Sequence, residues 1–210
     1  MTSVAIIDYG MGNLRSVAKA IERVAPDLDV EITADPARVA AAGRVVFPGQ
    51  GAMPDCMREL DRRGLRPAVL DAAAAKPFLG ICIGLQMLFG HSDEGDVPCL
   101  GIFAGEVARF GADMTGADGA RLKVPHMGWN EVWRRRPHPL WEGIPDGERF
   151  YFVHSYHVRP AAALVAAETD YGERFTSAVE RTNIFAIQFH PEKSAQAGLR
   201  LLSNFIHWAP

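Results

Sequence analysis

The feature that most constrains the fold is an alternation of short β-branched segments with a helical pattern in the first half of the chain. Apolar runs at 4–7, 30–33 and 45–47 are separated by glycine-containing turns and by a helical pattern over 14–24. Parallel strands need a long crossover connection, which is usually a helix, so this alternation indicates βαβ units. The sequence therefore predicts an α/β fold with a mostly parallel sheet flanked by helices.

Later segments change in character. A helical pattern over 58–75 breaks near Gly64, an apolar strand over 77–81 leads into a helix over 83–89, and a last helix is expected over 197–208. Further extended segments, with no helix between most of them, are predicted at 106–110, 122–124, 131–133, 150–154 and 185–189. We therefore expect one domain over residues 1–210, with a smaller antiparallel appendage.

Composition excludes several classes of protein. With 48% hydrophobic and 22% charged residues, 210 residues suit one globular domain, and a net charge of -3 lacks the basic excess of nucleic-acid-binding proteins. No signal peptide or apolar run of about 20 residues is present. Three cysteines without CxxC spacing argue against a disulfide framework or a zinc cluster. We expect a cytoplasmic protein without a metal or an organic cofactor.

Two patterns that suggest binding sites are incomplete. Gly10-Met11-Gly12 follows a strand and precedes a helix, but Arg15 stands where a dinucleotide fingerprint needs its third glycine. His154 and His157 are three residues apart in an extended segment, and no carboxylate joins them at metal-ligand spacing. Neither an NAD site nor a metal site is expected.

The central motif is a G-x-C-x-G string from Gly80 to Gly84, at the end of an apolar strand and the start of a helix. It has the form of a nucleophile elbow with sulfur in place of oxygen. Glycines flank the nucleophile because larger side chains would clash in its strained turn. The helix N-terminus behind Cys82 favours the thiolate. Taken alone, the motif also suits a buried structural cysteine at a tight helix–strand contact.

Two further strings supply what a cysteine nucleophile needs. His190-Pro191-Glu192 ends an apolar strand and offers a general base with a carboxylate to orient it. The two side chains are expected to project to one side of an extended segment. Gly49-Gln50-Gly51 closes another strand, and its glycines let backbone N–H groups turn toward an oxyanion, with Ile83 N–H as second donor.

With these three motifs in chain order, the whole sequence resembles the class I (triad) glutamine amidotransferases. Within that family, four strings resemble the glutaminase subunits of imidazole glycerol phosphate synthases. They are residues 7–14, 125–130, 151–156 and 188–194. The resemblance implies a flavodoxin-like fold, hydrolysis of glutamine to glutamate and ammonia, and delivery of the ammonia to a separate (β/α)8-barrel cyclase subunit in histidine biosynthesis, as a heterodimer.

The resemblance also implies a role for individual residues. Cys82 is the nucleophile, His190 the base and then the acid, and Glu192 its orienting partner. The other implied positions are Gly51, Gln86, Ser155 and Tyr156 for glutamine, Gly49 to Gly51 with Ile83 for the oxyanion, and Asn13, Tyr151 and Lys193 for the synthase partner. Gln50 departs from the family pattern, which commonly has a small apolar residue in this P-G-x-G string.

Three other functions remain open at this point: an amidotransferase for another synthase, a stand-alone cysteine hydrolase or peptidase, and a non-catalytic module that activates a partner. The strings 126–130 and 151–156 count against the first, and a complete set of nucleophile, base and orienting carboxylate counts against the third.

Overall fold

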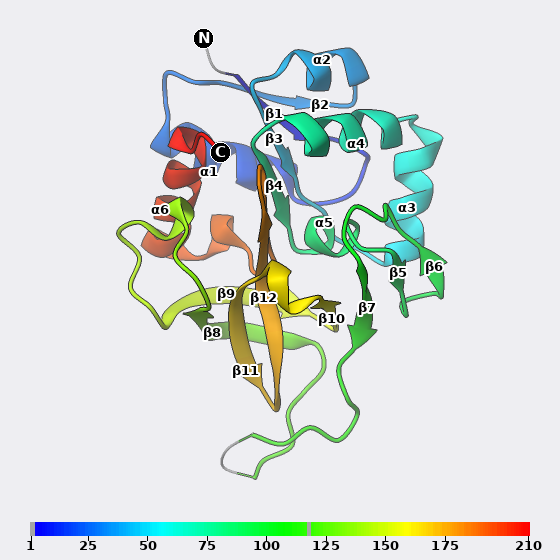
Figure 1. Ribbon diagram of the computed structural model, residues 1–210, viewed down its shortest axis with the longest axis vertical. Helices are drawn as coiled ribbons and strands as arrows, with labels where there is room; N and C mark the ends of the chain where they lie inside the picture. The colour runs from blue at the N-terminus through cyan, green and yellow to red at the C-terminus, as the bar shows by residue number, and fades with distance from the viewer. Residues whose placement is uncertain (1–2, 117–118) are drawn as a thin grey trace.

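A row of five parallel strands forms one half of the central sheet in the computed structural model, which describes residues 3–116 and 119–210 (Figure 1). In spatial order the strands are β2 (Asp29–Thr33), β1 (Ser3–Ile7), β3 (Arg44–Phe47), β4 (Phe78–Ile81) and β13 (Ile184–Ile187). Side chains along β1 alternate between two cores, with Val4 and Ile6 on one face and Ala5 and Ile7 on the other. Burial on both faces explains why these strands read as continuous apolar runs.

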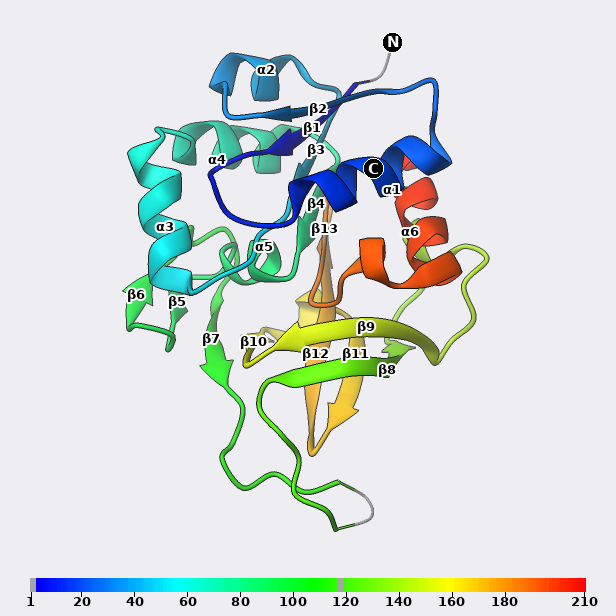
Figure 2. The ribbon, with the colours of Figure 1, turned by 180° about the vertical axis from the view of Figure 1, so that it is seen from behind.

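Helices cover both faces of the parallel half, as the front and rear views show (Figures 1 and 2). On one face lie α1 (Leu14–Val24) and α6 (Ala195–His207), whose apolar sides meet in a single core. On the other lie α2 (Pro36–Ala41), α3 (Met53–Arg62) and α4 (Arg66–Ala75). Gly64 has a φ of +66° between α3 and α4, in the left-handed region that ends helices.

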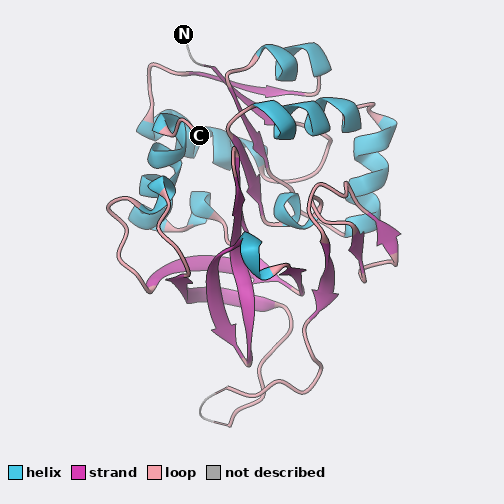
Figure 3. Cartoon of the chain, in the orientation of Figure 1, coloured by secondary structure: helices cyan, strands magenta, loops and turns pink. Residues whose placement is uncertain are grey.

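The other half of the structure is built almost wholly from strands (Figure 3). Next to β13 come β12 (Glu173–Arg181), β10 (Tyr156–Pro160) and β7 (Gly105–Arg109), each antiparallel to its neighbour. The short strands β5 (His91–Ser92) and β6 (Val97–Pro98) extend this edge. A branch continues from β12 through β11 (Val165–Tyr171) and β8 (His126–Arg134) to β9 (Glu148–His154). Three single 3₁₀ turns are η1 (Pro139–Trp141), η2 (Ala162–Leu164) and η3 (Pro191–Lys193).

The α/β class, with parallel strands flanked by helices, is confirmed, and α1 has the predicted bounds. Three details were wrong. The helix after Cys82 is the short α5 (Ile83–Gln86), which ends earlier than residue 89. Residues 122–124 are not a strand, and the segment predicted at 131–133 is part of the longer β8. β11 and β12 were missed, and β10 was expected only as the extended segment that contains His157, because the pattern of these strands depends on partners distant in the chain.

The strand order brings the three sequence motifs together. β3, β4 and β13 are neighbours and parallel, so the residues that follow them lie at the same edge of the sheet. These residues are Gly49, Cys82 and His190. Ligands of open α/β sheets bind at the carboxyl ends of the strands, which predicts a site at this edge. No helix in the described part of the chain is both long and apolar enough to cross a bilayer.

Candidate active site

The turn between β4 and α5 holds Cys82 in a strained backbone conformation. Its φ of 56° and ψ of -113° are unusual for a residue with a side chain and cost about 1–3 kcal/mol. Neighbouring glycines make the turn possible. A Cβ on Gly84 would collide with the Phe47 carbonyl oxygen, and one on Gly80 would lie 2.9 Å from Cβ of Ala186. The elbow predicted from G-x-C-x-G is therefore present, and close packing holds it.

His190 and Glu192 form a buried pair beside this turn. Nδ1 of His190 lies 2.9 Å from Oε1 of Glu192, and the two side chains are 2% and 1% exposed. Their approach was predicted from an extended segment, but residues 191–193 form the 3₁₀ turn η3, which curls the carboxylate back under the imidazole. Ser194 secures the turn, because its hydroxyl donates to the His190 carbonyl and accepts from Tyr151 N–H.

The surroundings of His190 favour its protonated form. Burial by itself lowers its pKa, but the negative charge of Cys82 and the bonded carboxylate of Glu192 outweigh this and raise the pKa to about 10. The carboxylate holds Nδ1–H, so Nε2 is the nitrogen left for proton transfer. In the described residues Nε2 has no hydrogen-bond partner. A protonated His190 can therefore act as a proton donor at neutral pH.

Gly49, Gln50 and Gly51 run beside the elbow, and the packing there requires both glycines. A Cβ on Gly49 would collide with the Tyr9 hydroxyl, and Gly51 has a φ of +117°. The Gln50 carbonyl turns to the protein interior, where the Cys56 thiol donates to it over 3.7 Å. Ile83 is the first residue of α5, so its N–H has no acceptor within that helix and is available to an oxyanion.

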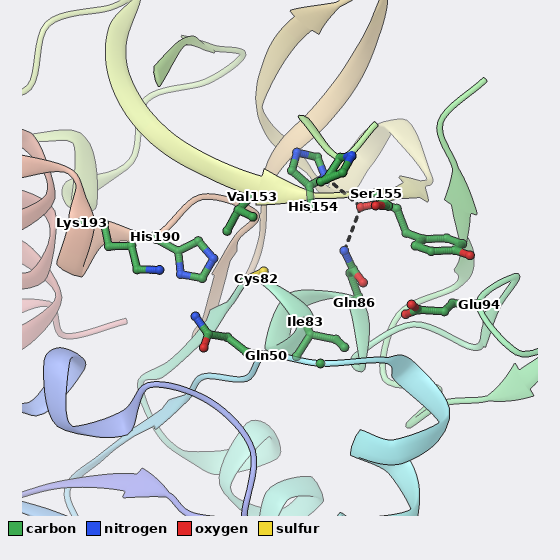
Figure 4. Close-up of a pocket in the computed structure, with 13 residues that line it drawn as sticks. Gln50, Cys82, Ile83, Gln86, Glu94, Val153, His154, Ser155, His190 and Lys193 are labelled. Carbon is green, nitrogen blue, oxygen red and sulfur yellow. Dashed lines mark hydrogen bonds between the residues drawn. The ribbon is translucent and has the colours of Figure 1, made fainter. Parts of the chain in front are cut away.

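A cavity of about 400 Å³ opens between the parallel and antiparallel halves (Figure 4). Cys82 and His190 line this cavity together with all four residues expected to hold glutamine. Gln50, Ile83 and Lys193 also line it. The four are Gly51, Gln86, Ser155 and Tyr156. Gln86 does not point freely into the cavity, because its amide nitrogen donates to the Tyr156 carbonyl at 2.9 Å and to Gln188 Oε1 at 3.0 Å.

Two polar residues at the site were missed by sequence reasoning. Glu94 lines the cavity from the turn between β5 and β6, and its carboxylate accepts from Met53 N–H at 2.8 Å. No sequence pattern surrounds it. Gln188 is fully buried and its amide nitrogen lies 3.7 Å from Cys82 Sγ. Its place two residues before His190, in the string 188–194, could have indicated it.

Of the residues expected at the partner interface, Lys193 lines this cavity, whereas Tyr151 and Asn13 are not among its lining residues. The ammonium of Lys193 lies 5.8 Å from the ring centre of Tyr151. Trp129 on β8 lies opposite Tyr151 on the neighbouring strand β9, and the centres of the two rings are 6.2 Å apart. Asn13 is exposed at the start of α1, in a loop whose Gly12 packs on Gly49.

The other two cysteines lack the features of a nucleophile. Both are buried, and burial raises the pKa of Cys56 to about 12 and that of Cys99 to about 11. All three thiols are free. Within residues 3–116 and 119–210, no three His, Cys, Asp or Glu side chains are grouped as metal ligands would be.

Two solved structures share the fold of this chain. A putative GMP synthase subunit from Thermoplasma acidophilum superposes with a TM-score of 0.71 at 20% identity, covering 99% of this chain and 93% of that one. PurLQS from Thermotoga maritima gives 0.72 at 16% identity, covering 99% of each chain. At this level of identity the likeness shows the fold alone.

Sequence comparison identifies the family. The model of the class-I glutamine amidotransferases matches residues 5–208. The imidazole glycerol phosphate synthase subunit HisH of Aromatoleum aromaticum is 77% identical over the whole of both chains. The subunit HisH of Dechloromonas aromatica is 69% identical over 99% of this chain and 97% of its own. The chain therefore belongs to the class-I glutamine amidotransferases and, among these enzymes, to the family of imidazole glycerol phosphate synthase subunit HisH.

Proposed function

We propose that this enzyme is the glutaminase subunit of an imidazole glycerol phosphate synthase and uses Cys82, His190 and Glu192 as its catalytic triad. It hydrolyses glutamine to glutamate and ammonia, and the ammonia passes to a (β/α)8-barrel cyclase subunit in histidine biosynthesis. The observation that carries the triad is the pair of His190 and Glu192, joined over 2.9 Å in the wall of the cavity that contains Cys82.

In the first half-reaction the Cys82 thiolate attacks the carboxamide carbon of glutamine. The carbonyl oxygen becomes an oxyanion, held by Ile83 N–H and by an N–H of the Gly49–Gly51 strand. The protonated His190 then donates from Nε2 to the departing nitrogen, which leaves as ammonia. A γ-glutamyl thioester remains on Cys82.

In the second half-reaction the neutral His190 removes a proton from water, and the hydroxide attacks the thioester. Collapse of the second oxyanion releases glutamate and returns Cys82 to the thiolate, while His190 keeps the proton. Each bond change is accounted for by these two residues and water, so the proposal includes no metal or organic cofactor. It also requires a reducing compartment for Cys82, consistent with three free cysteines and a cytoplasmic location.

Glutamine would lie with its carboxamide at Cys82 and its amino-acid end toward Gln86, Ser155 and Tyr156. Glu94 supplies a negative charge at this end of the cavity, and its bond to Met53 N–H fixes the carboxylate. Such a carboxylate is the natural partner of an α-ammonium group. Gln50 lies at the Cys82 end, so its long side chain would border the carboxamide.

A partner surface is supported by the aromatic side chains beside the cavity mouth. Met127 and Trp129 on β8 are 63% and 50% exposed, which is unusual for large apolar residues. Trp129 contacts Tyr151, and the Tyr151 ring lies 5.8 Å from the ammonium of Lys193, which lines the cavity. A protein bound on these side chains would therefore lie beside the site. This favours a subunit over a stand-alone hydrolase.

The test is steady-state release of glutamate by the purified chain alone, with the cyclase subunit, and with the cyclase subunit plus its nucleotide ligand. We expect slow hydrolysis by the chain alone and a rise of about 10²–10³ in the complex, because the Gly49–Gly51 strand can rotate one peptide plane and one oxyanion donor is worth that factor. Full activity in the first sample would instead support a stand-alone hydrolase.

A further inference from the structure

Mostly buried side chains between β8 and the nucleophile form a continuous series of hydrogen bonds, which we name the amide–imidazole relay. Its members, in order, are Asn130, His126, His154, the Tyr156 carbonyl, Gln86 and Gln188. The relay ends at Cys82, whose Sγ lies 3.7 Å from the Gln188 amide nitrogen. Figure 4 shows the bonds from His154 and Gln86 that meet at the Tyr156 carbonyl.

The outer half of the relay runs from Asn130 to the Tyr156 carbonyl. The direction of each of its hydrogen bonds follows from that carbonyl oxygen, which can only accept. Nδ1 of His154 lies 2.8 Å from the Tyr156 carbonyl, so this nitrogen carries a hydrogen. Burial lowers the pKa of His154 well below its ordinary value, so the ring is neutral and Nε2 is an acceptor. Nδ1 of His126, 3.0 Å away, must therefore donate to it.

The same reasoning continues to the end of the relay on β8. Burial lowers the pKa of His126 to about 4, so its ring is also neutral and Nε2 accepts from the Asn130 amide nitrogen at 3.3 Å. Two backbone groups fix the orientation of that amide. The nitrogen donates to the Asp170 carbonyl at 2.9 Å, and the oxygen accepts from Glu131 N–H at 2.8 Å.

The inner half is oriented from the same carbonyl. The Gln86 amide nitrogen donates to Tyr156 and also to Oε1 of Gln188. The oxygen of Gln188 is therefore committed to Gln86, and its amide nitrogen must face Cys82 Sγ. Gln188 is fully buried, so no water competes for this N–H. The sulfur therefore receives a donated hydrogen bond whose direction is set by the Tyr156 carbonyl through Gln86, and the outer half of the relay meets it at that carbonyl.

We propose that the amide–imidazole relay makes Gln188 a positioning residue that donates to the Cys82 sulfur, and that it couples β8 to the nucleophile. The inference rests on the proposed function, because it concerns the thiolate of that reaction. An N–H group stabilises a thiolate more than a thiol, since the anion is the stronger acceptor. Gln188 therefore raises the fraction of reactive sulfur and holds it in place.

β8 is suited to be the outer end because its two faces have different roles. Along a strand, alternate side chains point to opposite faces. Met127 and Trp129 are exposed on the face assigned to the partner, whereas His126 and Asn130 are the more buried residues of the opposite face. A shift of β8 on docking would change the bonds of His126 and Asn130, and through them the position of Gln188.

The first experiment measures alkylation of Cys82 by iodoacetamide as a function of pH, with each modified cysteine identified by peptide mass spectrometry. Gln188→Met keeps the length of the side chain but has no N–H. We expect the pH of half-maximal alkylation to rise by about one unit. Gln188→Glu places a carboxylate beside the sulfur and should raise it further. An unchanged midpoint in both variants would overturn the role of Gln188.

Other charged or titratable groups near the sulfur are unchanged in these variants. They are His190, Glu192, Tyr9, Cys56, Glu94 and Lys193. The buried Cys56 reports on folding in the same samples, because it is alkylated only if the structure opens. Should Gln188→Met expose Cys56, Gln188→Asn gives the decisive midpoint, since it keeps the amide but draws it away from the sulfur by one methylene.

The second experiment tests the outer half with two matched variants, His126→Phe and His157→Phe. Both histidines are 3% exposed and stack on aromatic rings, His126 on Tyr171 at 3.9 Å and His157 on Phe110 at 4.7 Å. Phenylalanine keeps the stacking and removes the ring nitrogens. His126 belongs to the relay. His157 lies 3.3 Å from the Glu173 carboxylate and is near His154, but within the described residues it makes no hydrogen bond to a relay member.

In the wild type we expect binding of the cyclase subunit to increase the rate of Cys82 alkylation. This increase should be roughly 2- to 30-fold smaller in His126→Phe and unchanged in His157→Phe. Equal losses, or none in either variant, would overturn the coupling. Failure of the proposed function looks different: the wild-type protein would then show no glutamine hydrolysis with the cyclase subunit. If the wild-type complex hydrolyses glutamine but His126→Phe shows the same Cys82 alkylation as His157→Phe, the proposed function stands and only the relay is wrong.

Discussion

The elbow and the wall that faces it are held by different forces. Around Cys82, contacts between backbone atoms leave no room for a side chain on Gly80 or Gly84. Across the cavity the wall consists of β9 and β10, with β8 paired to β9, and its His154 and His126 are held by side-chain hydrogen bonds and ring contacts. Packed backbone has few alternatives, whereas hydrogen bonds can be exchanged for others at small cost. The elbow is therefore the fixed half of the site, and the wall is the half that a partner can adjust.

The largest expected effect is on the fixed half. Cys82→Ala should reduce glutamine hydrolysis by about 10⁴-fold or more, because no other group can form the thioester. A complex that carries it should still make product from ammonium salts. Glutamate release and ammonia-dependent turnover are measured together, with Cys99→Ala as a control, since Cys99 is a buried thiol outside the cavity. More than a few per cent of residual hydrolysis would move the nucleophile away from the elbow.

Removal of the base His190 should reduce glutamine hydrolysis nearly as much as removal of Cys82. Replacement of Glu192, which orients His190, should reduce it less. His190→Ala deletes the proton carrier, whereas Glu192→Gln keeps a hydrogen-bonding partner 2.9 Å from Nδ1. The ratio of kcat/KM for the two variants measures the difference. Negligible losses in both would place the base on the wall, where His126 and His154 would be tested next.

A third prediction concerns folding rather than catalysis. Gly84→Ala should lower the free energy of unfolding by about 1–3 kcal/mol or more, because the new methyl group overlaps the Phe47 carbonyl oxygen. Gly111→Ala is the matched control, since its methyl group would meet only Met114 at 3.5 Å. Urea titration of both variants gives the comparison. Equal midpoints would mean that the elbow adapts to a side chain and is not the fixed half of the site.

The fourth prediction separates the two halves by the sign of their pH dependence. His126 on the wall has a pKa of about 4 in the folded chain. In the unfolded chain the same histidine binds a proton below about pH 6.5, whereas in the folded chain it stays neutral down to about pH 4. Its contribution to stability is lost as pH falls from about 6.5 to about 4, by up to about 3 kcal/mol. His190 has a raised pKa of about 10, so its contribution is complete below about pH 6.5 and is lost as pH rises through about 10.

Unfolding free energies of the wild type and of His126→Phe, measured from pH 7 to pH 4, check the acidic side. The variant should show the smaller decrease. The alkaline side is checked with His190→Ala between pH 7 and pH 10, where the wild type should lose more stability than the variant. A wild type whose stability is constant over both ranges would contradict the difference between the halves.

Much of the parallel half could be predicted, and much of the antiparallel half could not. Residues 14–24 carry a complete helical pattern, and the structure has a helix with those bounds. By contrast, only residues 131–133 of the nine-residue β8 were predicted. Its first residues, including Gly128 and Asn130, have no strong strand preference and become a strand because β9 pairs with them. Local pattern decides an element only where the element's own residues supply most of its stabilisation.

The sequence by itself determined which residue types carry the chemistry and in which order they occur. A cysteine between glycines needs that spacing because of backbone sterics, which are local. Only the tertiary structure decided what each buried histidine does. His190 lies beside Cys82 and the Glu192 carboxylate and holds a proton, whereas burial lowers the pKa of His126 and His154 and keeps them uncharged. A pKa depends on neighbours within a few ångströms, and most of those neighbours are distant in the chain.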